Sequence, residues 1–427
     1  MSKLGFELVC VDCRTAYPGL EPRYRCDCGG TLDVVHDLKA VAAAVDRDTF
    51  DRRRGGSAAL DRSGVWRFRE LILPLEDDRA VTRGEGNTQL YDTPAVAEYA
   101  GMKRLLLKHE GENPTGSFKD RGMTAGTTAA RLLNMNRVAC ASTGNTSASM
   151  ASYASIAGMR AFVFIPEGNI ALGKLSQALA YGARTLQLAG DFDAAMRIVE
   201  QVCGREDIYL LNSVNPFRIE GQKAIGFELL QDLEWHVPDW IVLPGGNLGN
   251  NSAIAKGLME LHELGWIDRL PRLAVIQADG ANPLYTAFRT GRPVEPVIAD
   301  TIATAIRIGD PVSWKKSLRG IAAMNGVVEQ VSDQEILDAK AQVDGAGIGA
   351  EPASCATVAG LRKLVANGTI DPESMVCGIL TGHLLKDPDV VVGYHTGGLD
   401  GIDAHHANAP ISVPDDLDAI LAELRRI

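Results

Sequence analysis

The most distinctive chemistry in this sequence comes from a lysine, Lys119, set in the polar motif His109–Gly122 (HEGENPTGSFKDRG). An uncharged stretch, Asn113 to Phe118, precedes it, so its amino group could be drawn out of water. Desolvation lowers the pKa of an ammonium group, and the neutral amine can form a Schiff base with a carbonyl compound. The alternative is a solvated surface lysine, which the charged neighbours Asp120 and Arg121 favour.

Two downstream segments add groups that suit a bound anion. The run Val138–Ser147 (VACASTGNTS) is typical of a strand that turns into a helix, and it gathers hydroxyl and amide side chains at the helix start. The apolar run Trp240–Pro244 leads into the glycine turn Gly245–Asn250 (GGNLGN), and a helical pattern follows. Exposed N–H groups at a helix start bind carboxylate or phosphate oxygens, and glycines let the backbone approach closely. Such turns also join strands to helices for purely steric reasons.

Taken in order, the motifs GENPTGSFKDRG, ASTGNTSASMASYA and PGGNLGN resemble the pyridoxal-phosphate enzymes of the tryptophan-synthase β fold type and, within them, the threonine synthases. The resemblance spans most of residues 64 to 388. Five further stretches agree with it: Gly64–Leu71, Gly84–Thr88, Asn212–Lys223, Ala303–Gly309 and Leu380–Pro388.

The resemblance implies a cofactor, pyridoxal 5′-phosphate, and residues that hold it. Lys119 matches the lysine that binds the cofactor covalently, Asn145 the amide that bonds its 3′-oxygen, and Thr381 the hydroxyl partner of its ring nitrogen. The cradle for its phosphate matches the residues Gly245, Gly246, Asn247, Leu248, Gly249 and Asn250. A threonine leaves the ring nitrogen largely neutral, so charge control must come from elsewhere. Without the other motifs, Thr381 is simply a strand-end threonine that caps a turn.

The resemblance also implies a phosphorylated amino-acid substrate. Three residues match the loop that holds the substrate carboxylate: Ser142, Thr143 and Asn145. Five match positions that receive the substrate phosphate: Thr146, Asn212, Ser213, Arg218 and Asn247. An arginine with several neutral donors suits a phosphomonoester, although Arg218 could instead be an ordinary arginine on a surface helix. The implied reaction converts O-phospho-L-homoserine and water to L-threonine and phosphate, with Lys119 as anchor, base and acid.

Three rival functions stay open. A cysteate synthase that uses O-phosphoserine and sulfite would keep the same motifs, and a threonine or serine dehydratase would keep Lys119 without needing Arg218. A non-catalytic regulator would have a vestigial site, which the intact lysine and glycine loop argue against. Two departures from the family pattern lie near predicted loops, namely Gln89 in place of proline and Leu384 in place of glycine. His383 could serve as an acid or base, or could pack beside the cofactor.

Four of the eight cysteines crowd the N-terminus, namely Cys10, Cys13, Cys26 and Cys28. The pattern C-x2-C followed by C-x-C predicts a zinc-ribbon-like knuckle that holds a structural Zn²⁺. Its second half is one residue shorter than the usual C-x2-C, so free thiols are the alternative. The other four cysteines lie in apolar runs and are expected to be buried and reduced.

Composition is that of an ordinary globular protein with 427 residues, 46% of them hydrophobic, and a formal net charge of −11. The acidic balance gives no general attraction to nucleic acid or to an anionic membrane, so neither is expected as a partner. No apolar run of the length of a membrane span or signal peptide appears, which predicts a cytoplasmic protein. We also expect a homodimer.

Short apolar strands alternate with longer helical segments from residue 104 onward, which predicts an α/β fold with two doubly wound, mainly parallel α/β domains. Ligands bind at the carboxyl ends of strands in such folds, so the three loop motifs can converge. The expected units are a ribbon at residues 1–35 and a catalytic region at 36–427. The resemblance adds a smaller mobile domain at about 134–212, with the cofactor in the cleft beside the larger domain that the flanking segments form.

Overall fold

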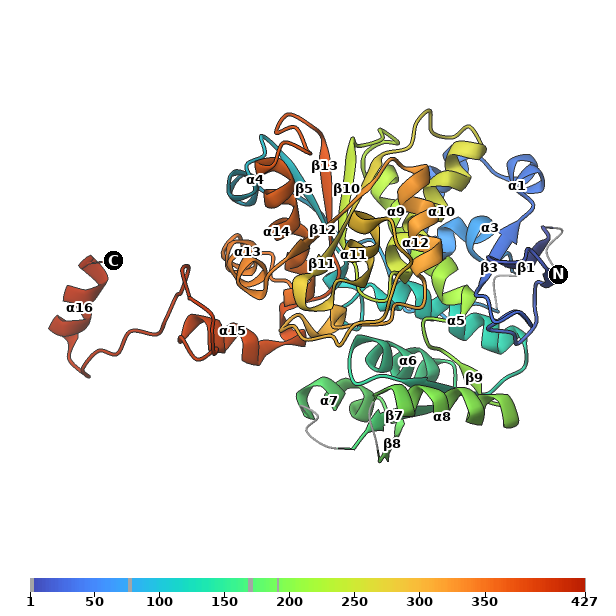
Figure 1. Ribbon diagram of the computed structural model, residues 1–427, viewed down its shortest axis with the longest axis horizontal. Helices are drawn as coiled ribbons and strands as arrows, with labels where there is room; N and C mark the ends of the chain where they lie inside the picture. The colour runs from blue at the N-terminus through green and yellow to red at the C-terminus, as the bar shows by residue number, and fades with distance from the viewer. Residues whose placement is uncertain (1–3, 76–78, 168–171, 190–191, 427) are drawn as a thin grey trace.

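The computed structural model describes residues 4–75, 79–167, 172–189 and 192–426. Its framework is two open sheets with helices packed on their faces (Figure 1). The larger sheet has the strand order β12-β11-β10-β13-β5-β4, and the smaller has the order β8-β7-β6-β9. Neighbouring strands are parallel throughout, except for the edge pair β4 and β5. The predicted α/β class and its mainly parallel sheets are therefore confirmed.

The larger sheet is buried on both faces. Its strands, in spatial order, are β12 (Val327–Val331), β11 (Arg272–Ala278), β10 (Trp240–Pro244), β13 (Val376–Leu380), β5 (Leu105–His109) and β4 (Leu90–Asp92). Alternate residues of β10 contact opposite layers, because successive side chains of a strand point to opposite faces: Ile241 and Leu243 pack in one core, and Trp240 and Val242 in the other.

The first core brings four helices onto one face of this sheet: α5 (Lys119–Leu132), α9 (Pro216–Asp232), α10 (Gly249–Glu263) and α12 (Trp314–Ala323). The second core brings three onto the other: α4 (Pro94–Ala100), α13 (Asp333–Gly345) and α14 (Pro352–Ala366). The sequence pattern did not predict β4 and β12. These strands are short or only partly buried, so they lack the continuous apolar run that marks β10 and β13.

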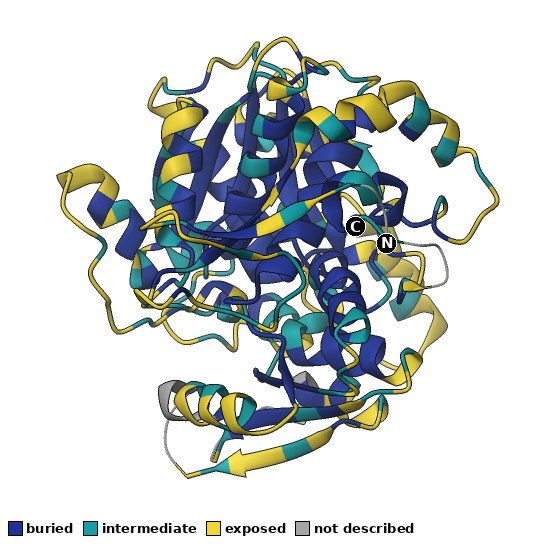
Figure 2. Ribbon diagram, turned by 90° about the vertical axis from the view of Figure 1, so that its right-hand side faces the viewer, coloured by how far each residue is buried: buried dark blue, intermediate teal, exposed yellow. Residues whose placement is uncertain are grey.

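The smaller sheet lies below the larger one in Figure 1. It consists of β8 (Arg184–Leu188), β7 (Arg160–Pro166), β6 (Arg137–Ala141) and β9 (Tyr209–Leu210), with the helices α6 (Asn145–Ile156), α7 (Leu172–Ala180) and α8 (Phe192–Arg205). The outer strand β8 is exposed over much of its length, at the bottom of the view in Figure 2. Strands and helices alternate here, as the sequence pattern predicts.

A three-stranded antiparallel sheet opens the chain, formed by β1 (Phe6–Cys10), β2 (Ala16–Pro18) and β3 (Leu32–His36). The N-terminal segment contacts a helix of the larger parallel sheet and a strand of the smaller one. Asp33 of β3 pairs with Lys316 and Arg319 of α12 at 3.0 and 2.6 Å. The Tyr24 hydroxyl accepts a hydrogen bond from the Leu210 N–H of β9 at 2.8 Å. The N-terminal segment therefore contacts elements of both sheets.

The remaining helices are short or peripheral: α1 (Leu38–Ala44), α2 (Arg47–Arg54), α3 (Arg69–Ile72), α11 (Pro283–Thr290), α15 (Pro388–His395) and α16 (Leu417–Arg426). Figure 1 shows α16 lying away from the body, at the end of an extended arm. Among the described residues, no helix has both the length and the apolar character that crossing a membrane requires.

Candidate functional site

The predicted site residues all follow strands of the two parallel sheets. Lys119 comes after β5, the glycine loop after β10 and Thr381 after β13, all from the larger sheet. Ser142 to Thr146 follow β6, and Asn212 to Arg218 follow β9, both from the smaller sheet. Because parallel strands end at one edge, these loops gather on the same side of their sheets.

Lys119 is the first residue of α5 and keeps only part of its side chain in contact with solvent. Burial lowers the pKa of its amino group to about 7, and the charge of Arg218 lowers it further while Glu351 opposes the shift. Its Nζ lies 4.0 Å from the centre of the Phe118 ring. The described part of the chain offers this nitrogen no hydrogen bond or ion pair. A neutral, unpaired amine in this position is a nucleophile and a base at physiological pH.

The neighbours that suggested a surface lysine are themselves buried. Arg121 bonds Glu110 at 2.6 Å and Glu228 at 2.8 Å, and none of its side chain is exposed. Asp120 accepts hydrogen bonds from Thr115 N at 2.7 Å, and burial raises the pKa of its carboxyl to about 6. The solvated interpretation of this motif is therefore wrong, because the charges next to Lys119 belong to the interior scaffold.

Backbone pairing joins the Lys119 motif to the segment that follows β13. The Phe118 N–H donates to the Thr381 carbonyl at 3.0 Å, and the His383 N–H donates to the Gly116 carbonyl at 3.0 Å. Ser117 and Gly382 form an isolated antiparallel bridge between them. Lys119 and Thr381 are thus held close together by short-range backbone geometry.

The hydroxyl and amide residues after β6 surround the start of α6. Asn145 is the first residue of this helix, and its Nδ2 donates to Glu351 at 2.9 Å. Ser142 Oγ accepts a hydrogen bond from the Gly144 N–H at 3.2 Å. Ser142, Thr143, Asn145 and Thr146 are all partly exposed, so their polar groups are accessible to a ligand.

The glycine loop after β10 forms a tight backbone turn. A Cβ atom on Gly245 would lie 2.6 Å from Val275 Cγ1, and one on Gly246 would lie 3.0 Å from Ile306 Cα. Leu248 has φ +62°, the left-handed conformation, and α10 begins at the next residue. Successive N–H groups in such a turn make a concave anion site. Both polar side-chain atoms of Asn250 are buried there without a partner, which suits a missing polar ligand.

Arg218 is a buried cation that no carboxylate neutralises among the described residues. It lies in the first turn of α9, which begins at Pro216 with Asn215 as its N-cap, and it is 2% exposed. Its Nη1 donates to the Leu211 carbonyl at 2.8 Å, whereas its Nε has no partner. Burial lowers the pKa of this guanidinium to about 10. The surface-helix alternative for Arg218 is wrong, since a buried unpaired guanidinium is costly unless an anion binds it.

Two further residues of the predicted phosphate set connect the sheets. Ser213 Oγ accepts a hydrogen bond from Asn247 Nδ2 at 2.7 Å, and Asn247 Oδ1 accepts one from Val312 N at 2.7 Å. The glycine loop therefore touches the loop after β9. Asn212 is instead used internally, because its amide pairs with both backbone groups of Ala141 at 2.9 and 3.0 Å. Asn212 positions the end of β6.

Sequence reasoning missed three polar residues at this place. The Glu351 carboxylate accepts from Asn145 and lies 3.4 Å from Thr381 Oγ1. Ser354 Oγ lies 3.0 Å from the same Thr381 oxygen. Lys386 reaches from the segment after β13 to Gln177 of α7, and burial lowers its pKa. The run Glu351-Pro352-Ala353-Ser354 before α14 was a usable signal, because it places polar groups at a helix start.

The departures from the family pattern have local explanations. Gln89 is exposed and uses its backbone N–H on Glu112 at 2.7 Å. Leu384 packs against Gly349, where any Cβ would lie 2.1 Å from a Leu384 methyl carbon. The His383 Nδ1 accepts a hydrogen bond from the Leu385 N–H at 3.2 Å. The His383 ring stacks on the His109 ring, with the two ring centres 6.3 Å apart. The structure gives His383 a packing contact beside the site.

The four N-terminal cysteines also come together, far from Lys119 in sequence. Their sulfur atoms all lie within 4.8 Å of one another, with Cys10 and Cys28 at 3.5 Å and Cys13 and Cys26 at 3.4 Å. The Asp12 N–H donates to Cys10 Sγ at 3.4 Å. Four thiolates at these separations can surround one tetrahedral metal ion.

Comparison with known proteins gives one family. The family described as "Pyridoxal-phosphate dependent enzyme" matches residues 81–382. A threonine synthase of Methanosarcina acetivorans is 48% identical, covering 91% of this chain and 94% of its own length. A threonine synthase of Methanocaldococcus jannaschii is 45% identical, covering 90% and 93%.

Among solved structures, maize serine racemase aligns with a TM-score of 0.62 at 20% identity, over 80% of this chain and 94% of its own. A threonine deaminase of Solanum lycopersicum aligns with a TM-score of 0.62 at 17% identity, over 81% and 93%. At these identities the likeness concerns the fold alone.

Proposed function

The chain belongs to the pyridoxal-phosphate dependent enzymes and, among them, to the threonine synthases, and on that premise we propose how its residues act. The reaction converts O-phospho-L-homoserine and water to L-threonine and phosphate. The γ-carbon loses phosphate and gains hydrogen, while the β-carbon loses a hydrogen and gains the hydroxyl of water. The observation that carries the residue assignment is the position of Lys119 at the start of α5, next to the Phe118–Thr381 backbone hydrogen bond and without an ion pair among the described residues, where burial lowers its pKa to about 7.

The residues present fit the cofactor, pyridoxal 5′-phosphate. Lys119 would hold its aldehyde carbon. The loop from Gly245 to Asn250 would hold its phosphate, because a glycine turn at a helix start exposes backbone N–H groups and the buried Asn250 side chain lacks partners. Asn145 and Thr381 would contact its ring. When bound, the cofactor withdraws electrons from the carbon that carries the substrate amino group.

The side chains of this chain supply binding and proton transfer. Arg218, Ser213, Asn247 and Thr146 would receive the substrate phosphate, since a guanidinium without a carboxylate partner favours a dianion. Asn212 would act on this phosphate site indirectly, because its amide holds the backbone of Ala141 at the end of β6. Ser142, Thr143 and Asn145 would hold the substrate carboxylate at the start of α6.

Lys119 would move the protons. As a neutral amine it would remove the protons from the α-carbon and the β-carbon, and as an ammonium it would return one proton to the γ-carbon after phosphate leaves and one to the α-carbon. Water supplies the hydroxyl at the β-carbon, and its remaining proton goes to the released phosphate. One group can serve both roles because a pKa near 7 makes both forms available. The nearest carboxyl that could compete, Glu351, faces Asn145 and Thr381.

Purified protein given O-phospho-L-homoserine should release threonine and phosphate in equal amounts, which amino-acid analysis and a phosphate assay measure together. Faster turnover of O-phosphoserine with sulfite would favour a cysteate synthase, and ammonia release from threonine or serine would favour a dehydratase. No turnover of any of these by a protein that binds the cofactor would overturn the assignment.

The proposal also covers the domains, the N-terminal metal site, the location and the partners. Residues 134–212 would form a smaller mobile domain beside a larger one, within a catalytic region of 36–427, with the cofactor between the domains. Residues 1–35 would form a ribbon in which Cys10, Cys13, Cys26 and Cys28 hold a structural Zn²⁺, which their mutual distances support. A cytoplasmic location, a homodimer and the absence of nucleic-acid or membrane partners stay predictions from the sequence.

A further inference from the structure

Glu351 is a buried carboxyl group that links two residues of the proposed cofactor site. Its Oε2 accepts a hydrogen bond from Asn145 Nδ2 at 2.9 Å, and its Oε1 lies at a long 3.4 Å from Thr381 Oγ1. Asn145 begins a helix of the smaller sheet, and Thr381 follows a central strand of the larger sheet. One carboxyl therefore contacts the two side chains proposed for the 3′-oxygen and the ring nitrogen of the cofactor.

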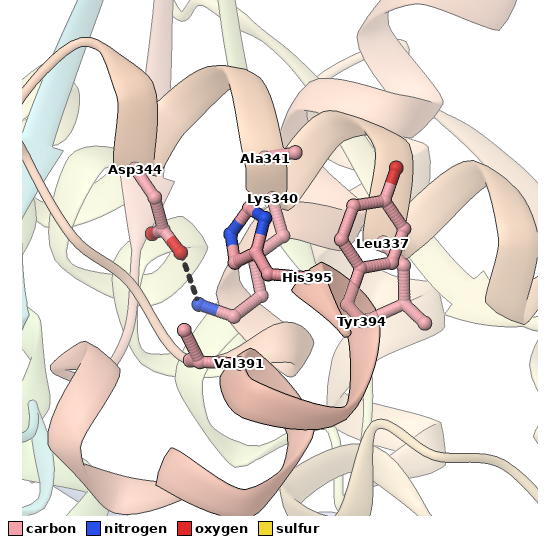
Figure 3. A pocket seen from close by; sticks show the side chains of 7 residues that line it. All are labelled: Leu337, Lys340, Ala341, Asp344, Val391, Tyr394 and His395. Atoms are coloured by element: carbon pink, nitrogen blue, oxygen red, sulfur yellow. Dashed lines mark hydrogen bonds and ion pairs between the residues drawn. The ribbon is translucent and has the colours of Figure 1, made fainter. Parts of the chain in front are cut away.

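Side chains of α13 hydrogen-bond the backbone next to Glu351. Figure 3 shows the ion pair between Lys340 and Asp344 of α13, with Nζ and Oδ2 2.6 Å apart. Lys340 Nζ also donates to the Ala350 carbonyl at 2.7 Å, and Asp344 Oδ1 accepts from the Ala350 N–H at 3.1 Å. The Glu351 N–H donates to the Gly382 carbonyl at 2.9 Å. These contacts hold the backbone at Ala350 and Glu351 beside the segment that carries Thr381.

The hydroxyl groups of Ser354 and Thr381 have defined donor and acceptor roles. Ser354 Oγ accepts from the N–H groups of Thr381 at 2.8 Å and Gly382 at 2.9 Å, which uses both of its lone pairs. Its own proton must therefore be donated, and Thr381 Oγ1 at 3.0 Å is nearer than the Gly382 carbonyl at 3.4 Å. Thr381 is left with one proton and one lone pair. One of these two can serve Glu351, and the other can serve a ligand.

Resting on the proposed function, we infer that Glu351 is a positioning residue that shares one proton with the ring nitrogen of the cofactor through the Thr381 hydroxyl. When the proton is on the nitrogen, the nitrogen donates to Thr381 and Thr381 donates to the Glu351 carboxylate. When the proton is on Glu351, Glu351 donates to Thr381 and Thr381 donates to the neutral nitrogen. Both arrangements satisfy every donor and acceptor in the relay. Glu351 thereby supplies the charge control that a threonine alone lacks.

The charges around Glu351 are compatible with this role. Burial raises the pKa of its carboxyl, and Asp387 after β13 raises it further. The hydrogen bond from Asn145 of α6 lowers it, as do the charges of Lys386 after β13 and Lys119 of α5. The net shift of the pKa is upward, which is the direction that a carboxyl sharing a proton requires.

The test measures the protonation of the ring nitrogen directly. Protein reconstituted with cofactor labelled at that nitrogen with a heavy isotope gives a nitrogen NMR resonance whose position differs between the protonated and neutral forms. In Glu351→Gln, the amide oxygen still accepts from Asn145, while its NH₂ group donates permanently to Thr381. The hydroxyl proton then faces the nitrogen, and we expect the resonance to move to the neutral position.

Two further variants make the result decisive. Thr381→Val interrupts the relay while keeping Glu351, so it should move the resonance in the same direction, and it replaces Glu351→Gln as the test if that variant fails to fold. The control Glu112→Gln removes an exposed carboxylate that bonds Gln89 and Tyr91, and should leave the resonance unchanged. Equal resonances in wild type and Glu351→Gln would overturn the inference. A wild type without any visible cofactor band would instead refute the proposed function.

Discussion

Buried cations occur in two regions of this molecule, and the regions treat them differently. In the scaffold, Lys108 is held by Glu228 at 2.8 Å and Asp232 at 2.6 Å, and Arg121 is held by Glu110 and Glu228. At the strand ends, Lys119 and Arg218 have no carboxylate ion pair among the described residues. An ion pair offsets the cost of removing a charge from water, so the fold neutralises these scaffold cations, whereas Lys119 and Arg218 stay available to ligands.

Two positions on one helix make the contrast sharp. Lys119 and Arg121 are two residues apart on α5, so their side chains leave the helix in different directions. Arg121 enters the scaffold and its pKa is raised by Glu110 and Glu228 against the effect of burial. Lys119 enters the site, where burial dominates and lowers its pKa. Side-chain direction alone separates a structural cation from a reactive one.

Removing the reactive cation should have the largest effect. Lys119→Ala is expected to abolish both the visible absorbance band of the bound cofactor and threonine formation, since Lys119 is the amine proposed for the covalent attachment. Absorbance spectra with excess cofactor measure this. The control Lys103→Ala removes an exposed lysine paired with Glu373 and should keep the band. A full band in Lys119→Ala would refute the assignment.

Breaking the scaffold should affect folding more than chemistry. Glu228 serves three cations, namely Lys108, Arg121 and Arg67, the last at 2.6 Å. Glu228→Ala leaves them with an uncompensated buried charge and should lower the free energy of unfolding by about 3–5 kcal/mol. Urea unfolding measures this loss. The control is Glu263→Ala, at an exposed glutamate, which should change the free energy of unfolding by about 0.5 kcal/mol at most. A loss of that small size in Glu228→Ala would show that the network contributes little.

Arg218 should behave in the opposite way to Glu228. Arg218→Met removes an unneutralised buried charge, so the free energy of unfolding should stay equal or rise. The KM for O-phospho-L-homoserine should rise about 10- to 100-fold, the size of a lost hydrogen bond to a charged group of about 1.5–3 kcal/mol. The visible cofactor band should remain. Steady-state kinetics and urea unfolding on the same sample test both statements, and an unchanged KM would remove Arg218 from the phosphate site.

The N-terminal cysteines offer a smaller and separate test. Protein purified under reducing, chelator-free conditions should contain about one zinc per chain, because four thiolates complete a structural site. Cys26→Ser should lose the metal and loosen the segment around Tyr24, while the cofactor band stays. Metal analysis by mass spectrometry measures the content. Absence of zinc from the wild type would favour free thiols.

The smallest predicted effect concerns the coupling of the two site cations. Acylation of the cofactor-free protein should label Lys119 with a midpoint at pH about 7, well below that of an ordinary lysine, because burial favours the neutral amine. Arg218→Met removes a positive charge that lowers this pKa, so the midpoint should move upward. Peptide mass spectrometry across a pH series follows it. A midpoint that moves downward would show that the two charges are not coupled as described.

Much of the fold could be predicted because its central strands are continuous apolar runs. Trp240–Pro244 and Val376–Leu380 are wholly buried, and their sequences carry that burial directly. The edge strands Leu90–Asp92 and Val327–Val331 were missed, since half-buried residues leave a weak pattern. The start of α9 at Pro216 is hard to predict, because its first turn carries Pro216 and Arg218 in place of a regular apolar stripe.

The sequence by itself determined which residues we propose for the chemistry, because Lys119, the glycine loop and Arg218 occur in motifs whose types and spacing are specific. Tertiary structure alone decided their state. Burial lowered the pKa of Lys119 to about 7, and the distribution of carboxylates left Arg218 without a described ion pair while Arg121 was paired. Only the fold brought Glu351 to Asn145 and Thr381, because that contact joins residues 206 and 30 positions apart in the chain. Desolvation and Coulomb energy depend on three-dimensional distance, which a linear pattern does not contain.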